Sequence, residues 1–234
     1  NGEIALFLHG SGWNLNVWHN QRALSSSLEV VLLDLPGHGG SDGPPCDSVA
    51  AYQRSVYKTI LSHQLKGCYV VGHSLGGAIA LSLACACPEL IKGIILIGTG
   101  AKLKVLPDIF ERVTLDKKTA AEYVTALAFS EHATIQLREY AISETMKADQ
   151  RTMYSDFRAC DGFDMRDMIQ SINAPSLVLC GNDDKLTPPK YSEFLNRSLA
   201  GSRLEIIANA GHMLMLEQPL KINETILKFV KETV

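Results

Sequence analysis

Residues 69–84 read YVVGHSLGGAIALSLA, and the pattern Gly-x-Ser-x-Gly at their centre separates two different kinds of apolar segment. Residues 69–71 are typical of the end of a buried strand, and the small residues that follow the pattern are typical of a helix. This context predicts a sharp turn from strand to helix that exposes a serine hydroxyl at the edge of a sheet. Gly72 and Gly76 lack the side chains that would crowd so tight a turn. We therefore expect Ser74 to be a nucleophile.

Short apolar runs alternate with helical patterns along most of the chain. Nearly continuous apolar strands indicate burial on both faces, which is the signature of a parallel sheet. The alternation predicts an α/β fold with a doubly wound, mostly parallel sheet. The strand-length runs are 4–8, 29–33, 68–71, 93–97, 176–180 and 203–207, and the helical patterns are 16–27, 49–65, 78–87, 190–199 and 219–234.

The stretch 101–171 interrupts this alternation. It contains no convincing strand, and helical patterns occur at 120–129, 134–148 and 151–160. We interpret the stretch as a helical cap inserted into a core of residues 1–100 and 172–234, because it leaves the sheet at the same edge as the serine turn. An extension of the core is the alternative. Several residues are candidates to line a substrate pocket: Leu103, Leu106, Ile109, Phe110, Val113, Leu127 and Phe129 from the stretch itself, and Trp13, His73 and Met213 from the core.

The overall composition is that of an ordinary globular protein. Of the 234 residues, 46% are hydrophobic and 20% charged, and the formal net charge of −3 gives no sign of a nucleic-acid-binding surface. No run approaches the roughly 18 apolar residues needed to span a bilayer, and nothing indicates an oligomer. The six cysteines are scattered, and we expect them to be small buried residues in a reducing, cytoplasmic compartment. Cys85 and Cys87 are too closely spaced for a zinc site.

A serine nucleophile needs a base, and the base needs an acid to orient it. Only His212, among seven histidines, lies in a loop after a late strand, and we expect it to be the base. The strand at 176–180 is followed by Gly-Asn-Asp-Asp, which leaves Asp183 and Asp184 as candidates for the acid. Either choice gives the chain order serine, aspartate, histidine that is typical of hydrolases with this kind of turn.

The oxyanion that develops on a substrate carbonyl must be held by backbone N–H groups. We expect one from Leu75, which directly follows the serine at a helix N-terminus, where the helix dipole favours negative charge. We expect the second from Ser11, in the segment His-Gly-Ser-Gly-Trp that follows the first strand. His9 of that segment is expected to be structural and to hydrogen-bond to nearby backbone.

Five segments together resemble the α/β-hydrolase superfamily, in the expected order and over nearly the whole core: residues 9–12, 34–41, 72–77, 181–188 and 211–212. The resemblance implies that the acid is Asp184, the fourth residue of Gly-x-x-Asp-x-x-x-Pro, and that 34–41 is structural. It implies no metal and no organic cofactor. Members of the superfamily usually carry one or two antiparallel strands before the first of these segments. Here only eight residues precede His9, so these strands are expected to be short or missing, which exposes an edge of the sheet.

The resemblance implies a lipase-like serine carboxylesterase that acts on small to medium acyl substrates through an acyl-enzyme. A serine at the turn argues against the haloalkane dehalogenases and epoxide hydrolases of the same superfamily, which use an aspartate. C–C bond hydrolase, lactonase, thioesterase and other acyl-transfer activities remain alternatives within the superfamily. A non-catalytic ligand-binding role is an alternative from another class.

Overall fold

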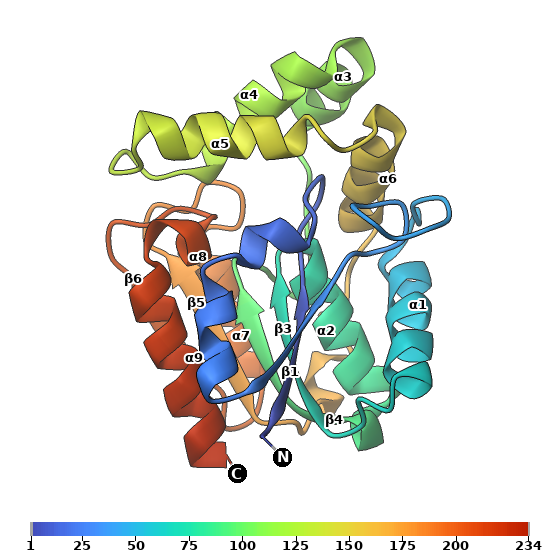
Figure 1. The fold of residues 1–234 in the computed structure, drawn as a ribbon, viewed down its shortest axis with the longest axis vertical. Coiled ribbons are helices and arrows are strands. Elements are labelled where there is room, and N and C mark those ends of the chain that lie inside the picture. Colours follow the sequence, from blue (N-terminus) through green and yellow to red (C-terminus); the bar gives the residue numbers. More distant parts are fainter. Residues whose placement is uncertain (1, 234) are drawn as a thin grey trace.

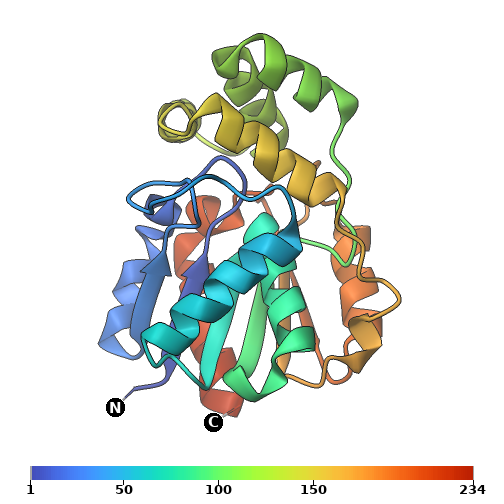
Figure 2. The same cartoon turned by 90° about the vertical axis from the view of Figure 1, so that its right-hand side faces the viewer.

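A parallel sheet packed between two layers of helices forms the body of the computed structural model, which describes residues 2–233 (Figures 1 and 2). Six strands lie in the order β2-β1-β3-β4-β5-β6, and every pair of neighbours is parallel. The predicted α/β fold and parallel sheet are thus confirmed. The strands are β1 (Ile4–Leu8), β2 (Glu29–Leu33), β3 (Cys68–His73), β4 (Ile91–Ile97), β5 (Ser176–Gly181) and β6 (Arg203–Ile207).

Helices bury both faces of the sheet, which explains why the strands are apolar along their length. In β1, Leu6 and Leu8 pack in one core layer, and Phe7 packs in the other. The first layer is covered by α1 (Val49–Ser62), α2 (Leu75–Ala86) and α7 (Pro189–Ser198). The second is covered by two 3₁₀ helices, η1 (Leu15–Trp18) and η2 (Gln21–Ser26), with α8 (Leu214–Glu217) and α9 (Pro219–Thr233). Two further 3₁₀ turns are η3 (Pro88–Leu90) and η4 (Ile169–Ser171).

The helix expected over 16–27 is wrong, because the chain forms the separate 3₁₀ turns η1 and η2 there. The side chain of Asn14 accepts a hydrogen bond from the Asn16 backbone N–H at 2.9 Å and starts the first turn. Asparagine and serine compete for backbone hydrogen bonds, so a stretch rich in them favours short turns over a continuous α-helix. By contrast α2 begins at Leu75, three residues earlier than expected, because the helix follows directly from the serine turn.

Four helices between β4 and β5, here called the helical layer, form the top of the molecule in Figure 1, above the carboxyl ends of the strands. Three were expected, and α3 was missed. Its signals are Pro107 and Asp108 in the first turn and apolar residues at helical spacing before and after them. The helices are α3 (Pro107–Leu115), α4 (Lys117–Ala128), α5 (Ile135–Thr145) and α6 (Gln150–Asp161).

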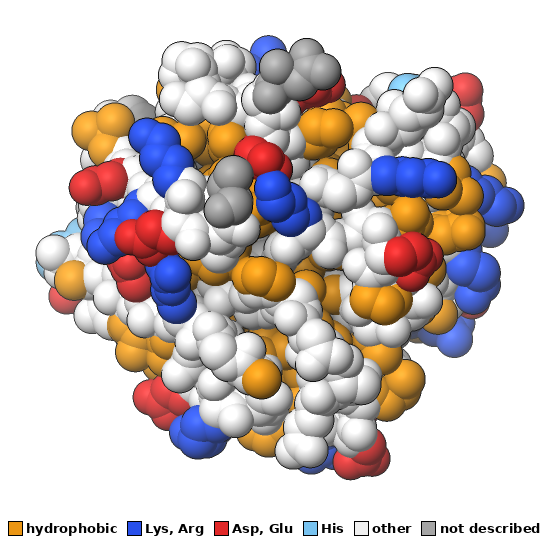
Figure 3. Space-filling model, turned by 90° about the horizontal axis from the view of Figure 1, so that it is seen from below, with side chains coloured by type: hydrophobic (Ala, Val, Ile, Leu, Met, Phe, Trp, Pro, Cys, Tyr) orange, Lys and Arg blue, Asp and Glu red, His pale blue; other side chains and the backbone are white. Residues whose placement is uncertain are grey.

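The surface away from the helical layer carries side chains of both charge signs (Figure 3). Within residues 2–233, no helix is both long enough and apolar enough to cross a membrane. The same residues contain no group of three or more histidine, cysteine or acidic side chains placed to hold a metal ion. They include all six cysteines, none of which forms a disulfide.

Candidate active site

Ser74 lies on the turn that joins β3 to α2. Its backbone angles, φ 52° and ψ −112°, lie outside the regions that residues with a side chain favour. A Cβ atom at Gly72 would lie 2.2 Å from the Gly76 carbonyl oxygen, and one at Gly76 would lie 2.2 Å from the carbonyl oxygen of Leu8. The Ser74 N–H donates to the carbonyl of Ile97 at 2.9 Å. The strained turn is therefore held by close backbone contacts that only glycine permits.

The loops after β5 and β6 bring Asp184 and His212 together. His212 Nδ1 donates to Asp184 Oδ2 at 2.8 Å, and both residues are buried. Asp184 Oδ1 accepts the backbone N–H groups of Leu186 at 2.9 Å and Thr187 at 2.8 Å. The Thr187 hydroxyl donates to Asp184 Oδ2 at 2.8 Å and lies 3.1 Å from His212 Nδ1. Because Nδ1 faces the carboxylate, Nε2 is the ring nitrogen of His212 left for another partner.

The neighbouring Asp183 has a different environment. Its backbone N–H donates to the carbonyl of Ala210 at 3.0 Å, while its half-buried side chain makes no hydrogen bond within residues 2–233. The structure thus places Asp184, and not Asp183, against His212.

Ser74 and His212 line the same pocket. No hydrogen bond joins the Ser74 hydroxyl to His212 in the part of the chain that the structure describes. Such contacts are often long before substrate binds and shorten in the reacting complex. The arrangement therefore brings the three expected residues to one edge of the sheet, with the hydrogen bond between Asp184 and His212 already formed.

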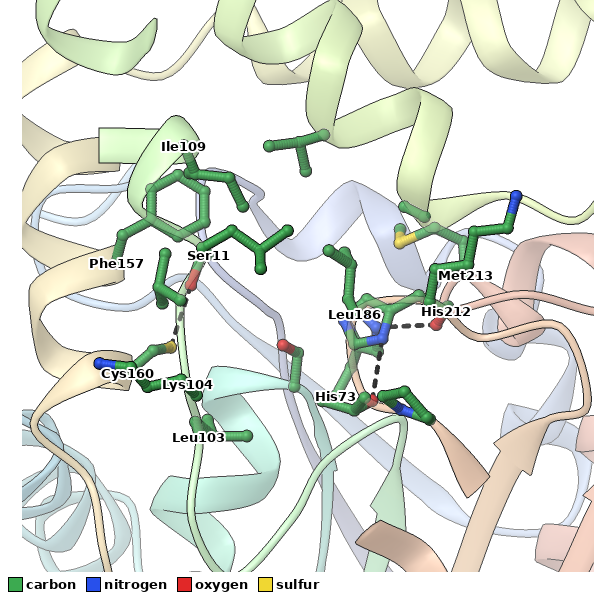
Figure 4. Close-up of a pocket in the computed structure, with 18 of the residues that line it drawn as sticks. Ser11, His73, Leu103, Lys104, Ile109, Phe157, Cys160, Leu186, His212 and Met213 are labelled. Carbon is green, nitrogen blue, oxygen red and sulfur yellow. Dashed lines mark hydrogen bonds between the residues drawn. The ribbon is translucent and has the colours of Figure 1, made fainter. Parts of the chain in front are cut away.

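The two expected oxyanion donors also lie at this edge. Leu75 is the first residue of α2, and within residues 2–233 neither its N–H nor that of Ser11 is bonded to another protein group. The Ser11 hydroxyl lies 3.4 Å from Cys160 Sγ (Figure 4). Burial raises the pKa of Cys160 to about 12, so the thiol is neutral. Two unengaged N–H groups beside a serine are the arrangement that an oxyanion needs.

His73, expected in the pocket, lines it and also contacts the loop of His212. Its Nε2 donates to the carbonyl of His212 at 3.0 Å. Burial and the nearby His212 lower the pKa of His73 well below its ordinary value, so the ring is neutral. The residue before the expected nucleophile therefore holds the loop of the expected base.

Asp156 of α6 is a fully buried carboxylate that sequence reasoning missed. Its Oδ2 accepts the backbone N–H of Gly12 and the Nε2–H of His38, each at 2.8 Å, and its Oδ1 accepts the Tyr52 hydroxyl at 2.5 Å. Gly12 directly follows Ser11, so this carboxylate joins the helical layer to the expected oxyanion loop. No motif marks it. The available signal was an aspartate on the buried face of an amphipathic helix.

Two buried histidines beside this network have pKa values that are shifted in opposite directions. Burial lowers the pKa of His38, but the hydrogen bond and the charge of Asp156 outweigh it, so its pKa lies above the ordinary value. His38 Nδ1 also faces the carbonyl of Pro36 at 3.1 Å, which suits a protonated ring. Burial, and then the charge of His38, lower the pKa of His9 to about 3. His9 Nε2 accepts the N–H of Leu35 at 3.0 Å, which confirms its expected structural role.

The helical layer is also tied to the loop of His212. At the end of α4 the carbonyl of Ala128 accepts the His212 backbone N–H at 2.6 Å. The Glu217 carboxylate accepts the N–H of Ser130 at 2.9 Å and that of Gly211 at 2.8 Å, so it bridges the layer and the loop. One set of helices therefore contacts both sides of the site.

A pocket of about 240 Å³ lies between Ser74 and the helical layer. Figure 4 shows Ile109 and Phe157 on one side of it, with His212 and Met213 on the other. Most of its wall is apolar, as is usual for small-molecule sites. Seven residues expected in the pocket do line it: Trp13, His73, Leu103, Leu106, Ile109, Phe129 and Met213.

Phe110 was wrongly expected in this pocket. Its ring packs edge-on against Tyr154, with ring centroids 5.6 Å apart, and it does not line the cavity. Val113 and Leu127 do not line it either. These residues lie on helices whose apolar sides also face one another, and sequence spacing cannot separate that contact from the side that faces the pocket.

Comparisons with known proteins agree with this geometry. A family model described as alpha/beta hydrolase fold matches residues 6–219. The chain is 27% identical over 245 residues to the pimeloyl-[acyl-carrier protein] methyl ester esterase of Aeromonas hydrophila, covering 98% of this chain and 96% of that one. It is 34% identical to a thermophilic esterase of known structure, with a TM-score of 0.85 and coverage of 98% and 90%. An enol-lactonase from Burkholderia xenovorans LB400 has the same fold, with a TM-score of 0.93, 22% identity and coverage of 99% and 92%.

Proposed function

This chain belongs to the alpha/beta hydrolase fold family and is a hydrolase, and from that premise we propose that it cleaves carboxylic esters with Ser74 as nucleophile. His212 is then the general base and Asp184 the acid that orients it. The observation that carries the proposal is the hydrogen bond of 2.8 Å between His212 and Asp184 at the pocket that Ser74 lines. The two similar proteins named as esterases favour esters over other acyl compounds.

The proposed reaction has two halves. The Ser74 hydroxyl attacks the acyl carbon while its proton passes to His212 Nε2, and the N–H groups of Ser11 and Leu75 hold the oxyanion. When the tetrahedral intermediate collapses, the carbon–oxygen bond to the alcohol breaks and His212 returns the proton to that alcohol. A water molecule, deprotonated by His212, then attacks the acyl-enzyme and releases the carboxylic acid and Ser74. Asp184 holds the imidazole in the required tautomer throughout.

The size of the pocket supports small to medium acyl groups. Its volume of about 240 Å³ is below the range of about 300–1,000 Å³ typical of sites for drug-sized ligands. We propose that residues 101–171 act as a cap, since Leu103, Leu106 and Phe129 of that stretch line the pocket above Ser74. A long acyl chain would have to extend beyond this cap.

The first experiment is hydrolysis of p-nitrophenyl esters from acetate to dodecanoate by the wild type and by Ser74→Ala. We expect turnover to peak at short chains. The substitution is expected to lower kcat by about 10³-fold or more, since the members of such a triad act as a unit.

A fluorophosphonate probe separates the alternatives, because only an activated serine reacts with it rapidly. Labelling of Ser74 without turnover of any ester would contradict ester hydrolysis and direct the search to lactones, thioesters and C–C bonds. A protein that neither labels nor turns over an ester would be a ligand-binding member of the family, and the proposed mechanism would be wrong.

A further inference from the structure

A second cavity, of about 330 Å³, adjoins the pocket that contains Ser74. Lys190 and Tyr191 line both cavities, so the two meet at these side chains. Four of the residues around the second cavity are cations, and we call it the cationic cavity. Its lining residues are Lys102, Arg166, Lys190 and Arg197, with Ala101, Tyr191 and Phe194.

The cations come from three segments that the fold holds together. Lys190 and Arg197 are seven residues, or about two turns, apart on α7, which places them on the same side of that helix. Lys102 follows β4 and Arg166 follows α6. These two segments are joined by an isolated bridge between Lys102 and Asp164 and by a hydrogen bond of 2.7 Å from the Met165 N–H to the Ala101 carbonyl. Backbone contacts therefore hold together the segments that build the cavity wall.

Among residues 2–233, only one carboxylate is paired with these four cations. Asp164 accepts Lys102 Nζ at 3.0 Å and the Arg166 guanidinium at 2.7 Å. Lys190 and Arg197 form no ion pair with any residue among 2–233. Glu193 lies on the same helix as both, but it is exposed and lines neither cavity. A concentration of positive charge is unexpected in a chain whose formal net charge is −3.

The main pocket itself is cationic at its rim. Lys104 and Lys185 line it together with Lys190, and Lys104 is paired with Asp161 at 2.8 Å. Most of the remaining wall is apolar. A ligand that occupied both cavities would therefore place an uncharged part near Ser74 and a negatively charged part beside Arg197.

We propose that the cationic cavity binds an anionic group, a carboxylate or a phosphate, of the molecule whose acyl bond is cleaved in the main pocket. This inference rests on the proposed function. A guanidinium can bind such a group through two parallel hydrogen bonds, and a lysine adds a point charge. Tyr191 and Phe194 provide the apolar wall along which a short chain reaches the anion. Clustered positive charge also attracts an anionic substrate toward the site.

Matched pairs of substrates test this site. One pair is monomethyl adipate and methyl hexanoate, which differ by a carboxylate on the acyl side. The other is hexanoyl-4′-phosphopantetheine and hexanoyl-pantetheine, which differ by a phosphate on the leaving group. We expect a higher kcat/KM for the anionic member of at least one pair, and the pair that responds identifies the anion.

Arg197→Gln tests the residue, and Lys228→Gln is the matched control because Lys228 is an exposed lysine on α9 that lines neither cavity. The ratio of kcat/KM between the anionic and the neutral member is expected to fall about fivefold in Arg197→Gln, as for the loss of about 1 kcal/mol at an exposed charge pair. It should fall further in Arg197→Glu and stay unchanged in Lys228→Gln. High salt should reduce the ratio in the wild type.

The outcomes separate this inference from the proposed function. Turnover of neutral esters with no preference for an anion, or with a preference that Arg197→Gln leaves intact, would overturn the cationic cavity alone. If no ester or thioester is turned over, the proposed function fails, and calorimetric titration with adipate still tests the cavity. Weaker adipate binding by Arg197→Gln than by Lys228→Gln would support it, and equal binding by the two variants would overturn it.

Discussion

At the scale of single residues, Asp183 and Asp184 are chemically identical neighbours with different surroundings. Asp184 accepts hydrogen bonds from Leu186, Thr187 and His212, whereas the Asp183 side chain has none within residues 2–233. A carboxylate enclosed by donors is fixed in direction, which is what the proposed base His212 requires of its partner.

Asp184→Asn is expected to lower kcat for a p-nitrophenyl ester by about 10⁴-fold, because an amide favours the wrong tautomer of the histidine. Asp183→Asn is the matched control and should change kcat less than about threefold, as expected for a side chain outside the hydrogen-bonded pair. Steady-state kinetics of both variants at neutral pH measure the difference. Equal losses in the two variants, or the reverse order, would contradict the assignment of the acid.

At this scale, prediction from sequence works where the chain neighbours of a residue define its chemistry. The glycines beside Ser74 predict its place on the turn from strand to helix, and the strand before His212 predicts its place in a loop at the sheet edge. Asp156 could not be identified in this way, because its partners Gly12, His38 and Tyr52 lie more than 100 residues away in the chain. Its neighbours in sequence show only that it belongs to a helix.

At the scale of elements, the helical layer is joined to the core by buried polar contacts as well as by apolar packing. Asp156 holds the loop of Ser11, and the Ala128 carbonyl holds the loop of His212. The loop of the expected donor Ser11 and the loop of the expected base therefore depend on helices that contribute neither residue. The number of helices was underestimated from sequence, because the pattern at 107–115 is short and was not separated from the loop before it.

Asp156→Asn is expected to lower the free energy of unfolding by about 3–5 kcal/mol, because it leaves the buried His38 without its counter-charge. It should also lower kcat for a p-nitrophenyl ester by about 10- to 100-fold, through displacement of the oxyanion loop. Urea unfolding and ester kinetics measure the two effects.

Asp161→Asn, on the same helix, is the matched control. Asp161 is paired with the exposed Lys104, and the loss of such a pair costs at most about 1 kcal/mol. A similar loss of stability in the two variants would show that the buried network has no special importance.

At the scale of the whole molecule, the sheet brings distant segments to one edge. Because all six strands are parallel, the carboxyl ends of β1, β3, β5 and β6 lie at the same edge of the sheet. The segments that follow these strands begin there and carry Ser11, Ser74, Asp184 and His212. This part of the site follows from the strand pattern. The position of the cationic cavity does not, because it depends on how α7 packs beside the segments around Lys102 and Arg166.

The pH dependence of stability is a property of the whole molecule that the buried histidines determine. His38 has a raised pKa in the folded state, so it stabilises the folded protein when it is protonated. Its contribution to the free energy of unfolding is fully present below the ordinary pKa of about 6.5 and is lost as the pH rises through the folded pKa. His9 and His73 have lowered pKa values, so they destabilise the fold as the pH falls below about 6.5.

The free energy of unfolding of the wild type minus that of His38→Gln is therefore expected to be larger at about pH 5.5 than at about pH 8.5. The substitution also removes the charge of His38 beside His9. Burial is the larger cause of the lowered pKa of His9, so the His9 ring stays neutral in the wild type and in the variant. Urea unfolding across this range measures the difference. A difference that is constant, or that grows with pH, would mean that His38 is not charged in the folded protein.

The carboxylate of Asp156 also limits how freely the helices above the sheet can be exchanged between enzymes. A graft of residues 101–171 from another hydrolase would replace Asp156 together with the pocket lining, and the recipient would keep Gly12, His38 and Tyr52 with no acceptor beneath the new helices. An exchange of helices that is meant to change the substrate range is thus restricted to α3, α4 and α5, and the recipient must keep its own α6.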